Sequence, residues 1–199
     1  MLDIIVLSAG QSSRMGSDKA LLDIDGIPAI VHIINKVISF SDNIYIVLGD
    51  NLETVKSEVI EYFGDMETIN FIHNELHWKG MFSSVQKGFE GVSGNNAVML
   101  QLIDQPFISQ NIYNELVSNY NPKYLITQPS YIKEGLKRGG HPLLFAPGFK
   151  DIVLSYPVDS QLNEVINKNN DSRKFVEVID ESILHNLNTK KEFNDKFKG

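Results

Sequence analysis

Short apolar runs alternate along the chain with segments of helical periodicity. Five runs rich in β-branched residues are apolar at nearly every position, as expected for strands buried on both faces of a parallel sheet, and a sixth alternates more clearly. The predicted strands are 2–8, 43–49, 68–73, 96–103, 124–129 and 174–179. Apolar residues recur at helical spacing between them. The predicted helices are 30–38, 52–62, 81–89, 112–120 and 162–166.

Strands that alternate with helices form βαβ units, whose crossovers are right-handed. We therefore predict a three-layer α/β/α sandwich around a mostly parallel, Rossmann-like sheet, as a single domain over residues 1–199. The segment 119–148 is the least periodic. Its glycines and prolines predict an irregular excursion over one rim of the sheet.

Composition narrows the possible chemistry. The 199 residues include no cysteine, which excludes a disulfide framework, a thiolate metal site and a cysteine nucleophile. The formal net charge of -7 argues against a nucleic-acid partner, because the phosphate backbone selects basic surfaces. The N-terminal apolar run is much shorter than the roughly 20 residues of a membrane span and lacks a basic flank. We expect a cytoplasmic protein with no membrane partner.

The stretch LSAGQSSRMGSDK, residues 7–19, follows the first predicted strand. In open α/β sheets the ligand crevice lies beyond the carboxyl ends of the strands, so this loop is a candidate binding site. Gly10 and Gly16 let the backbone approach a ligand, and Arg14 and Lys19 add two positive charges. The hydroxyl donors are Ser12 and Ser13. Each cation–phosphate pair is worth about 4 kcal/mol before desolvation, so the loop is suited to phosphate despite the acidic protein.

The spacing excludes two common phosphate loops. Five residues separate Gly10 from Gly16, and Lys19 stands three positions beyond, whereas a Walker A motif has four residues between its glycines and Lys-Ser/Thr directly after the second. No G-x-G-x-x-G triplet is present, which disfavours an NAD-binding dehydrogenase. A solvated surface turn is the remaining alternative to an anion site.

Three further segments carry candidate site residues. Asp104 ends the predicted strand 96–103 at the same rim and is either a Mg²⁺ ligand or a cap of the following helix. In KGMFSSVQKG, residues 79–88, a glycine and two serines begin a helix, where they either contact a ligand or cap the helix. Those three residues are Gly80, Ser83 and Ser84. The neighbouring Trp78 either packs on a flat ligand such as a pterin or packs in the core, and we expect the core.

The third segment is RGGHPLLF, residues 138–145. Its histidine and arginine either attract an anionic acceptor or serve the local structure. The candidate acceptor-binding residues are Arg138, Gly140, His141 and Pro142.

LSAGQSSRMGSDKALL resembles the L-A-A-G-x-S-x-R-M-G-x-x-K-x-L-L signature of the MobA-like nucleotidyltransferases. LIDQP resembles the family's metal-binding L-x-D-x-P element, GMFSS its G-M-x-x-S element over the nucleotide base, and GHP a pattern of the cytidylyltransferase branch. The resemblance implies a fold of the nucleotide-diphospho-sugar transferase type, with Arg14, Lys19 and Asp104 as catalytic residues and Mg²⁺ on Asp104. The implied nucleotide-binding residues are Leu7, Ser8, Ala9, Gly10, Ser12, Ser13, Gly16, Gly80, Ser83 and Ser84.

Among these enzymes the sequence is most similar to the molybdenum cofactor cytidylyltransferases. The implied reaction moves CMP from CTP onto the terminal phosphate of molybdopterin and releases pyrophosphate, with a molybdenum hydroxylase as client. The sequence departs from the family pattern at Ser8, which replaces the usual alanine, and at Asn188 and Lys190, which replace an aspartate and a proline. Asn188 remains a candidate second Mg²⁺ ligand, because an amide oxygen can also bind the metal. Guanylyl transfer, transfer to a sugar or alditol phosphate, and a non-catalytic nucleotide- or cofactor-binding module remain alternatives.

Overall fold

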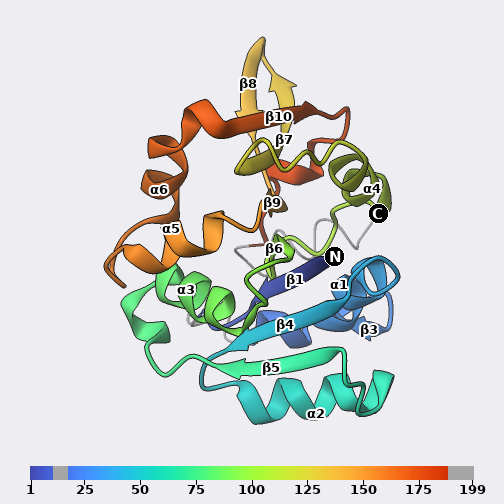
Figure 1. The fold of residues 1–199 in the computed structure, drawn as a ribbon. Helices are drawn as coiled ribbons and strands as arrows, with labels where there is room; N and C mark the ends of the chain where they lie inside the picture. Colours follow the sequence, from blue (N-terminus) through green and yellow to red (C-terminus); the bar gives the residue numbers. More distant parts are fainter. Residues whose placement is uncertain (11–17, 188–199) are drawn as a thin grey trace.

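The computed structural model describes residues 1–10 and 18–187. Within these residues, eight strands form a mixed sheet in the order β10-β7-β9-β6-β1-β4-β5, with β8 paired to β7 (Figure 1). The strands are β1 (Leu2–Leu7), β4 (Asn43–Leu48), β5 (Ile69–His73), β6 (Ala97–Leu102), β7 (Ile126–Lys133), β8 (Leu136–Gly139), β9 (Leu143–Phe145) and β10 (Arg173–Glu177). A separate two-stranded ribbon joins β2 (Asp23–Ile24) to β3 (Ile27–Pro28).

The central strands end together at one edge of the sheet. β1 pairs in parallel with β4 and β6, and Leu7 is level with Val47 and Leu102. β7 and β10 run in the same direction, whereas β8 and β9 are antiparallel to their neighbours. This common carboxyl edge is where an open α/β sheet offers a crevice to a ligand.

Helices cover both faces of the sheet (Figure 1). One face is packed by α1 (Ala29–Val37), α2 (Leu52–Phe63) and α4 (Gln110–Ser118), and the other by α3 (Met81–Gly91), α5 (Phe149–Ser155) and α6 (Leu162–Lys168). Short 3₁₀ turns are η1 (Lys19–Leu21), η2 (His77–Lys79), η3 (Asn170–Ser172) and η4 (Glu181–Leu184). No helix in the described part of the chain is long and apolar enough to cross a bilayer.

The two-residue period of β1 divides the core into two halves. Ile4 and Val6 belong to the cluster under α1, α2 and α4, whereas Ile5 and Leu7 belong to the cluster under α3, α5 and α6. Ile4, Ile5 and Val6 are fully buried. Burying each such side chain contributes about 1.5–3 kcal/mol, so a central strand apolar on both faces anchors both layers.

The structure confirms the three-layer prediction and all five predicted helices, and it adds α5. The prediction of an excursion over residues 119–148 is wrong, because this segment supplies β7, β8 and β9. β9 lies between β6 and β7 inside the sheet. Three residues are too few to show a strand period, and the flanking Gly140 and Pro142 favoured a loop interpretation.

Candidate functional site

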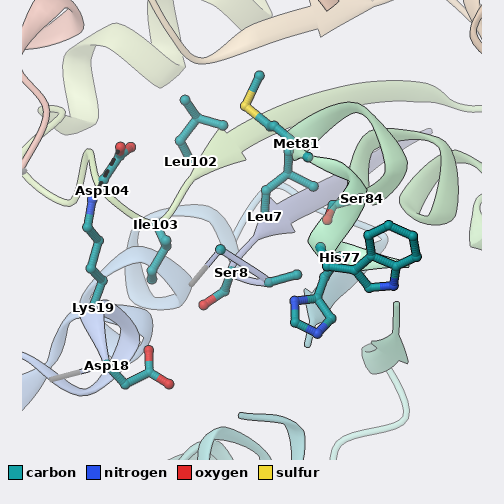
Figure 2. A pocket seen from close by; sticks show the side chains of 14 residues that line it. Leu7, Ser8, Asp18, Lys19, His77, Met81, Ser84, Leu102, Ile103 and Asp104 are labelled. Atoms are coloured by element: carbon teal, nitrogen blue, oxygen red, sulfur yellow. Dashed lines mark ion pairs between the residues drawn. The ribbon is translucent and has the colours of Figure 1, made fainter. Parts of the chain in front are cut away.

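A cavity of about 380 Å³ opens at the carboxyl edge of the sheet, beside the ends of β1 and β6. Figure 2 shows Lys19 and Asp104 on one side of the cavity and His77, Met81 and Ser84 on the other. The lining residues are Leu7, Ser8, Ala9, Gly10, Asp18, Lys19, His77, Trp78, Gly80, Met81, Ser84, Leu102, Ile103 and Asp104. Three parts of the chain that are distant in sequence therefore converge on this cavity, within residues 7–19, 77–84 and 102–104.

The hollow forms where strand pairing stops. Ser8 N–H still donates to Val47 O at 2.9 Å, and Ile103 N–H donates to Leu7 O at 3.1 Å, so β1 remains paired through its last residue. Gly10 and Asp104 lie just beyond this last pairing and line the cavity. The sheet thus fixes the cavity floor, and the segments after the strands form its sides.

Lys19 and Asp104 form the charged side of the cavity. Asp18 caps η1 by accepting the Ala20 N–H at 2.9 Å, which places Lys19 in the first position of this turn. Lys19 Nζ lies 3.7 Å from Asp104 Oδ2, and both side chains are about one-fifth exposed. A cation and a carboxylate in this arrangement suit a phosphate group and a divalent metal ion, respectively.

The carboxylate of Asp104 fits a metal ligand. Its Oδ1 is buried and has no hydrogen-bond partner among the described residues. Burial raises the pKa of Asp104, while the nearby Lys19 charge opposes that rise. A buried carboxylate oxygen without a partner is costly unless a cation binds it. This orphaned oxygen therefore fits Mg²⁺, which binds through one or two carboxylates together with substrate phosphates.

Buried polar groups hold the Asp104 turn. Leu187 N–H donates to Asp104 O at 2.7 Å. Gln101 Nε2 donates to Leu102 O at 2.8 Å, and the Tyr113 hydroxyl donates to Gln101 Oε1 at 2.9 Å. Gln101 is not among the residues predicted from the sequence. A polar residue within the apolar strand 96–103 could nevertheless have indicated that this side chain makes buried hydrogen bonds.

The opposite side of the cavity contains an imidazole and an indole. His77 Nε2 lies 3.2 Å from Asp50 Oδ1, and the buried Nδ1 has no partner among the described residues. Trp78 is 66% exposed, with Lys79 Nζ 5.5 Å from the centre of its ring. The expectation that Trp78 packs in the core is wrong, because η2 carries it on the cavity rim instead.

The predicted glycine and serines at the start of α3 have different surroundings. Gly80 adopts a φ of +113°, a region that favours glycine, and lines the cavity with Ser84. Ser83 does not line the cavity: its hydroxyl lies 2.8 Å from Gly80 O and 2.9 Å from Leu76 O. Asn74 Nδ2 donates to both serine hydroxyls, at 3.0 and 2.9 Å. Ser84 thus faces the cavity, whereas Ser83 stabilises the turn that precedes α3.

Three of the predicted acceptor residues, Gly140, His141 and Pro142, lie at the carboxyl edge but do not line the cavity. Gly140 to Pro142 come directly before β9, whose Leu143 is level with Leu100 of β6. Gly140 packs so closely on the Ile183 backbone that a Cβ atom would collide with it. Burial lowers the pKa of His141 to about 4, and its Nε2 has no partner among the described residues. His141 is therefore neutral at physiological pH.

Arg138 lies apart from the other predicted acceptor residues. It is on exposed β8, opposite Tyr131, in the hairpin that projects from the body of the protein (Figure 1). The structure therefore does not bring Arg138 to the cavity.

Five predicted site residues lie outside the described part of the chain: Ser12, Ser13, Arg14, Gly16 and Asn188. Their roles remain predictions. The described residues that border them are Gly10, Asp18 and Leu187. Each of the three either lines the cavity or hydrogen-bonds to Asp104.

The fold and the site define a three-layer α/β protein with a charged cavity at the carboxyl edge of its sheet. A family model, the MobA-like NTP transferase domain, matches residues 4–173. The chain belongs to this family.

Individual relatives are more distant. The bifunctional protein GlmU of Campylobacter jejuni strain 81116 is 30% identical over 118 residues, which are 58% of this chain and 26% of the relative. The chain thus matches about a quarter of that protein. A probable molybdenum cofactor guanylyltransferase of Nostoc sp. PCC 7120 is 50% identical over 46 residues, which are 23% of this chain and 22% of the relative.

Solved structures match over the whole length. Rv0371c from Mycobacterium tuberculosis H37Rv has a TM-score of 0.82 and 16% identity, with 100% of this chain and 98% of that chain covered. Its complex with manganese has a TM-score of 0.77 and 15% identity, with 100% and 98% covered. At these identities the likeness concerns the fold.

Proposed function

We propose that the protein transfers a nucleoside monophosphate from an NTP to a phosphate-bearing acceptor and releases pyrophosphate. The observation that carries the proposal is the Lys19–Asp104 pair, 3.7 Å apart in a 380 Å³ cavity at the carboxyl edge of the sheet. The cation suits a phosphate group, and the orphaned Asp104 oxygen suits a divalent metal ion. Family membership supports the same chemistry.

In the proposed reaction, a phosphate oxygen of the acceptor attacks the α-phosphorus of the NTP. A new P–O bond forms there, and the bond from the α-phosphorus to the bridging oxygen breaks, so that pyrophosphate leaves with the electron pair. An ionised acceptor phosphate needs no general base, so catalysis consists of positioning and charge neutralisation.

In this proposal each residue of the site has a separate role in binding the phosphates, the metal ion or the nucleoside. Lys19 stabilises charge on the α-phosphate, and Arg14 binds the leaving pyrophosphate. Asp104 holds Mg²⁺, which when bound neutralises charge on the phosphates. Ser84 and Gly80 line the same cavity, and in this proposal they contact the nucleoside. The manganese complex of Rv0371c supports a divalent metal in this fold.

For the specific substrates we propose CTP and molybdopterin, with the protein supplying a molybdenum hydroxylase. The GMFSS and GHP elements support the cytidylyl branch. The Nostoc relative supports the molybdenum cofactor as acceptor, but its name favours guanylyl transfer, which makes GTP the second candidate.

The test is release of pyrophosphate from each of the four NTPs with molybdopterin and Mg²⁺. We expect turnover with CTP and its loss in Asp104→Asn, while Asp65→Asn, at an exposed loop position, leaves turnover unchanged. Turnover with GTP alone would show that the nucleotide substrate is GTP and would contradict the proposed CTP. Sugar and alditol phosphates are tested as acceptors in the same way. Tight nucleotide binding without turnover on any acceptor would contradict the proposed transferase activity and favour a non-catalytic binding module.

A further inference from the structure

Asn51 stands at the residue before α2, the position where an asparagine normally caps a helix. Its side chain makes no capping hydrogen bond to α2, Leu52–Phe63. An asparagine in this position ordinarily accepts an N–H from the first turn of its helix and so stabilises it. The Asn51 side-chain amide makes its hydrogen bonds to other residues instead.

The amide instead hydrogen-bonds to three other residues, two of which, Ser8 and Asp18, line the cavity. Asn51 Nδ2 donates to Ser8 O at 3.1 Å and to Asp18 Oδ2 at 2.7 Å. Asn51 Oδ1 accepts the Gly49 N–H at 3.1 Å. Ser8 directly follows β1, and Asp18 directly precedes η1, so one side chain ties together two points ten positions apart on either side of the predicted phosphate loop.

The contact to Asp18 continues to the charged side of the cavity. Asp18 Oδ2 accepts from Asn51, while its Oδ1 accepts the Ala20 N–H at 2.9 Å. Lys19 lies between Asp18 and Ala20 in the sequence, and its Nζ faces Asp104. The Asn51 amide thus holds the residue that directly precedes and caps η1, the turn that carries Lys19.

We propose that Asn51 is a positioning residue of the nucleotide site. It fixes the two ends of the phosphate loop, so that Lys19 is held toward the cavity before the nucleotide binds. This inference rests on the proposed function, because it assigns to Asn51 the preorganisation that a phosphate-transfer site requires. The cost is a helix end without its side-chain cap.

This arrangement predicts that substitutions of Asn51 affect activity more than stability. Asn51→Ser and Asn51→Asp both introduce good capping residues at the start of α2, and the aspartate also interacts favourably with the helix dipole. Serine is too short to span from Ser8 to Asp18, and an aspartate carboxylate would repel Asp18. Asn51→Ser keeps a residue type suited to a helix start, so it should retain a melting temperature close to that of the wild type while losing activity, which a merely structural role would not produce. Asn51→Asp should also lose activity, with a melting temperature lowered by the repulsion from Asp18.

The experiment measures kcat, KM for the NTP and the melting temperature of Asn51→Ser, Asn51→Asp and Asn70→Ser. Asn70, whose amide reaches the Thr68 carbonyl, is the matched control. We expect kcat/KM to fall on the order of 10- to 100-fold in both Asn51 variants. The control should match the wild type. Combining Asn51→Asp with Asp18→Asn restores a donor opposite an acceptor and should recover part of the loss.

The outcomes separate this inference from the proposed function. Wild-type kcat/KM in Asn51→Ser, or a loss of activity in this variant that parallels a loss of melting temperature, overturns the role of Asn51. A wild-type protein that binds an NTP without turnover overturns the proposed function. Calorimetric NTP affinity then decides the role of Asn51: weaker binding in Asn51→Ser supports it, and equal binding overturns it. A wild-type protein that binds none of the four NTPs overturns both.

Discussion

At the scale of single residues, the site consists of groups whose polar atoms are held by neighbours and directed at one hollow. Lys19 is placed by the cap of its own turn, and Asp104 by the backbone bond from Leu187. Sequence motifs predicted Lys19 and Asp104 as site residues, because each has a characteristic residue type at a fixed position after a predicted strand. Asn51 and His77 could not be recognised, because their partners are distant in sequence.

Lys19→Ala should lower the chemical step more than nucleotide binding. In the proposed reaction the ammonium group faces developing charge at the α-phosphate, and removing one such donor typically costs on the order of 10²- to 10³-fold in rate. Single-turnover rates and calorimetric affinities for the NTP measure the two effects separately. Lys87→Ala, which breaks an exposed pair with Glu90, should leave both unchanged. Equal losses of rate and affinity in Lys19→Ala would contradict the assignment.

His141 predicts a specific dependence of stability on pH. Its pKa is lowered by burial from 6.5 to about 4, so between these values the unfolded chain binds a proton that the folded chain does not. The free energy of unfolding should therefore fall as the pH falls from 6.5 to about 4. Urea unfolding at pH 7 and pH 5 should show a smaller loss for His141→Gln than for the wild type. His73→Gln, at an exposed position, should behave as the wild type, and identical losses in all three proteins would contradict the buried neutral state.

At the scale of elements, segments with a visible apolar period were predictable, whereas the four-residue β8 and the three-residue β9 were not. Each predicted helix has an apolar face that packs on the sheet, so sequence period and burial agree. β9 is three residues long and is held in place by its neighbours β6 and β7. Its position is a property of the assembled sheet, which explains why residues 119–148 were misinterpreted.

The close packing of α3 on the sheet gives a prediction at this scale. A Cβ atom on Gly88 would lie 2.7 Å from Ile5 Cγ2 and 3.2 Å from Val47 Cγ2. Gly88→Ala should destabilise the fold by about 1–3 kcal/mol, because α3 must move away from β1. Gly94→Ala, where a Cβ atom meets nothing within 4 Å, is the control. Urea unfolding measures both, and equal free energies of unfolding would contradict tight packing at Gly88.

At the scale of the whole molecule, the topology of the sheet creates the site. Parallel β1 and β6 end side by side, so the segments after Leu7 and after Leu102 meet, although they are almost one hundred residues apart. The turn before α3 and the segment that ends at Leu187 reach the same edge. A net charge of -7 is compatible with an anionic ligand, because Lys19 acts at short range within the cavity.

The most direct test of the central claim is a crystal structure of the protein with CTP and Mn²⁺, with the metal located by its anomalous signal. We predict a metal ion bound to an Asp104 carboxylate oxygen and triphosphate density beside Lys19, within the cavity between β1, β6 and α3. Nucleotide and metal bound elsewhere, with the cavity free of both, would contradict the account.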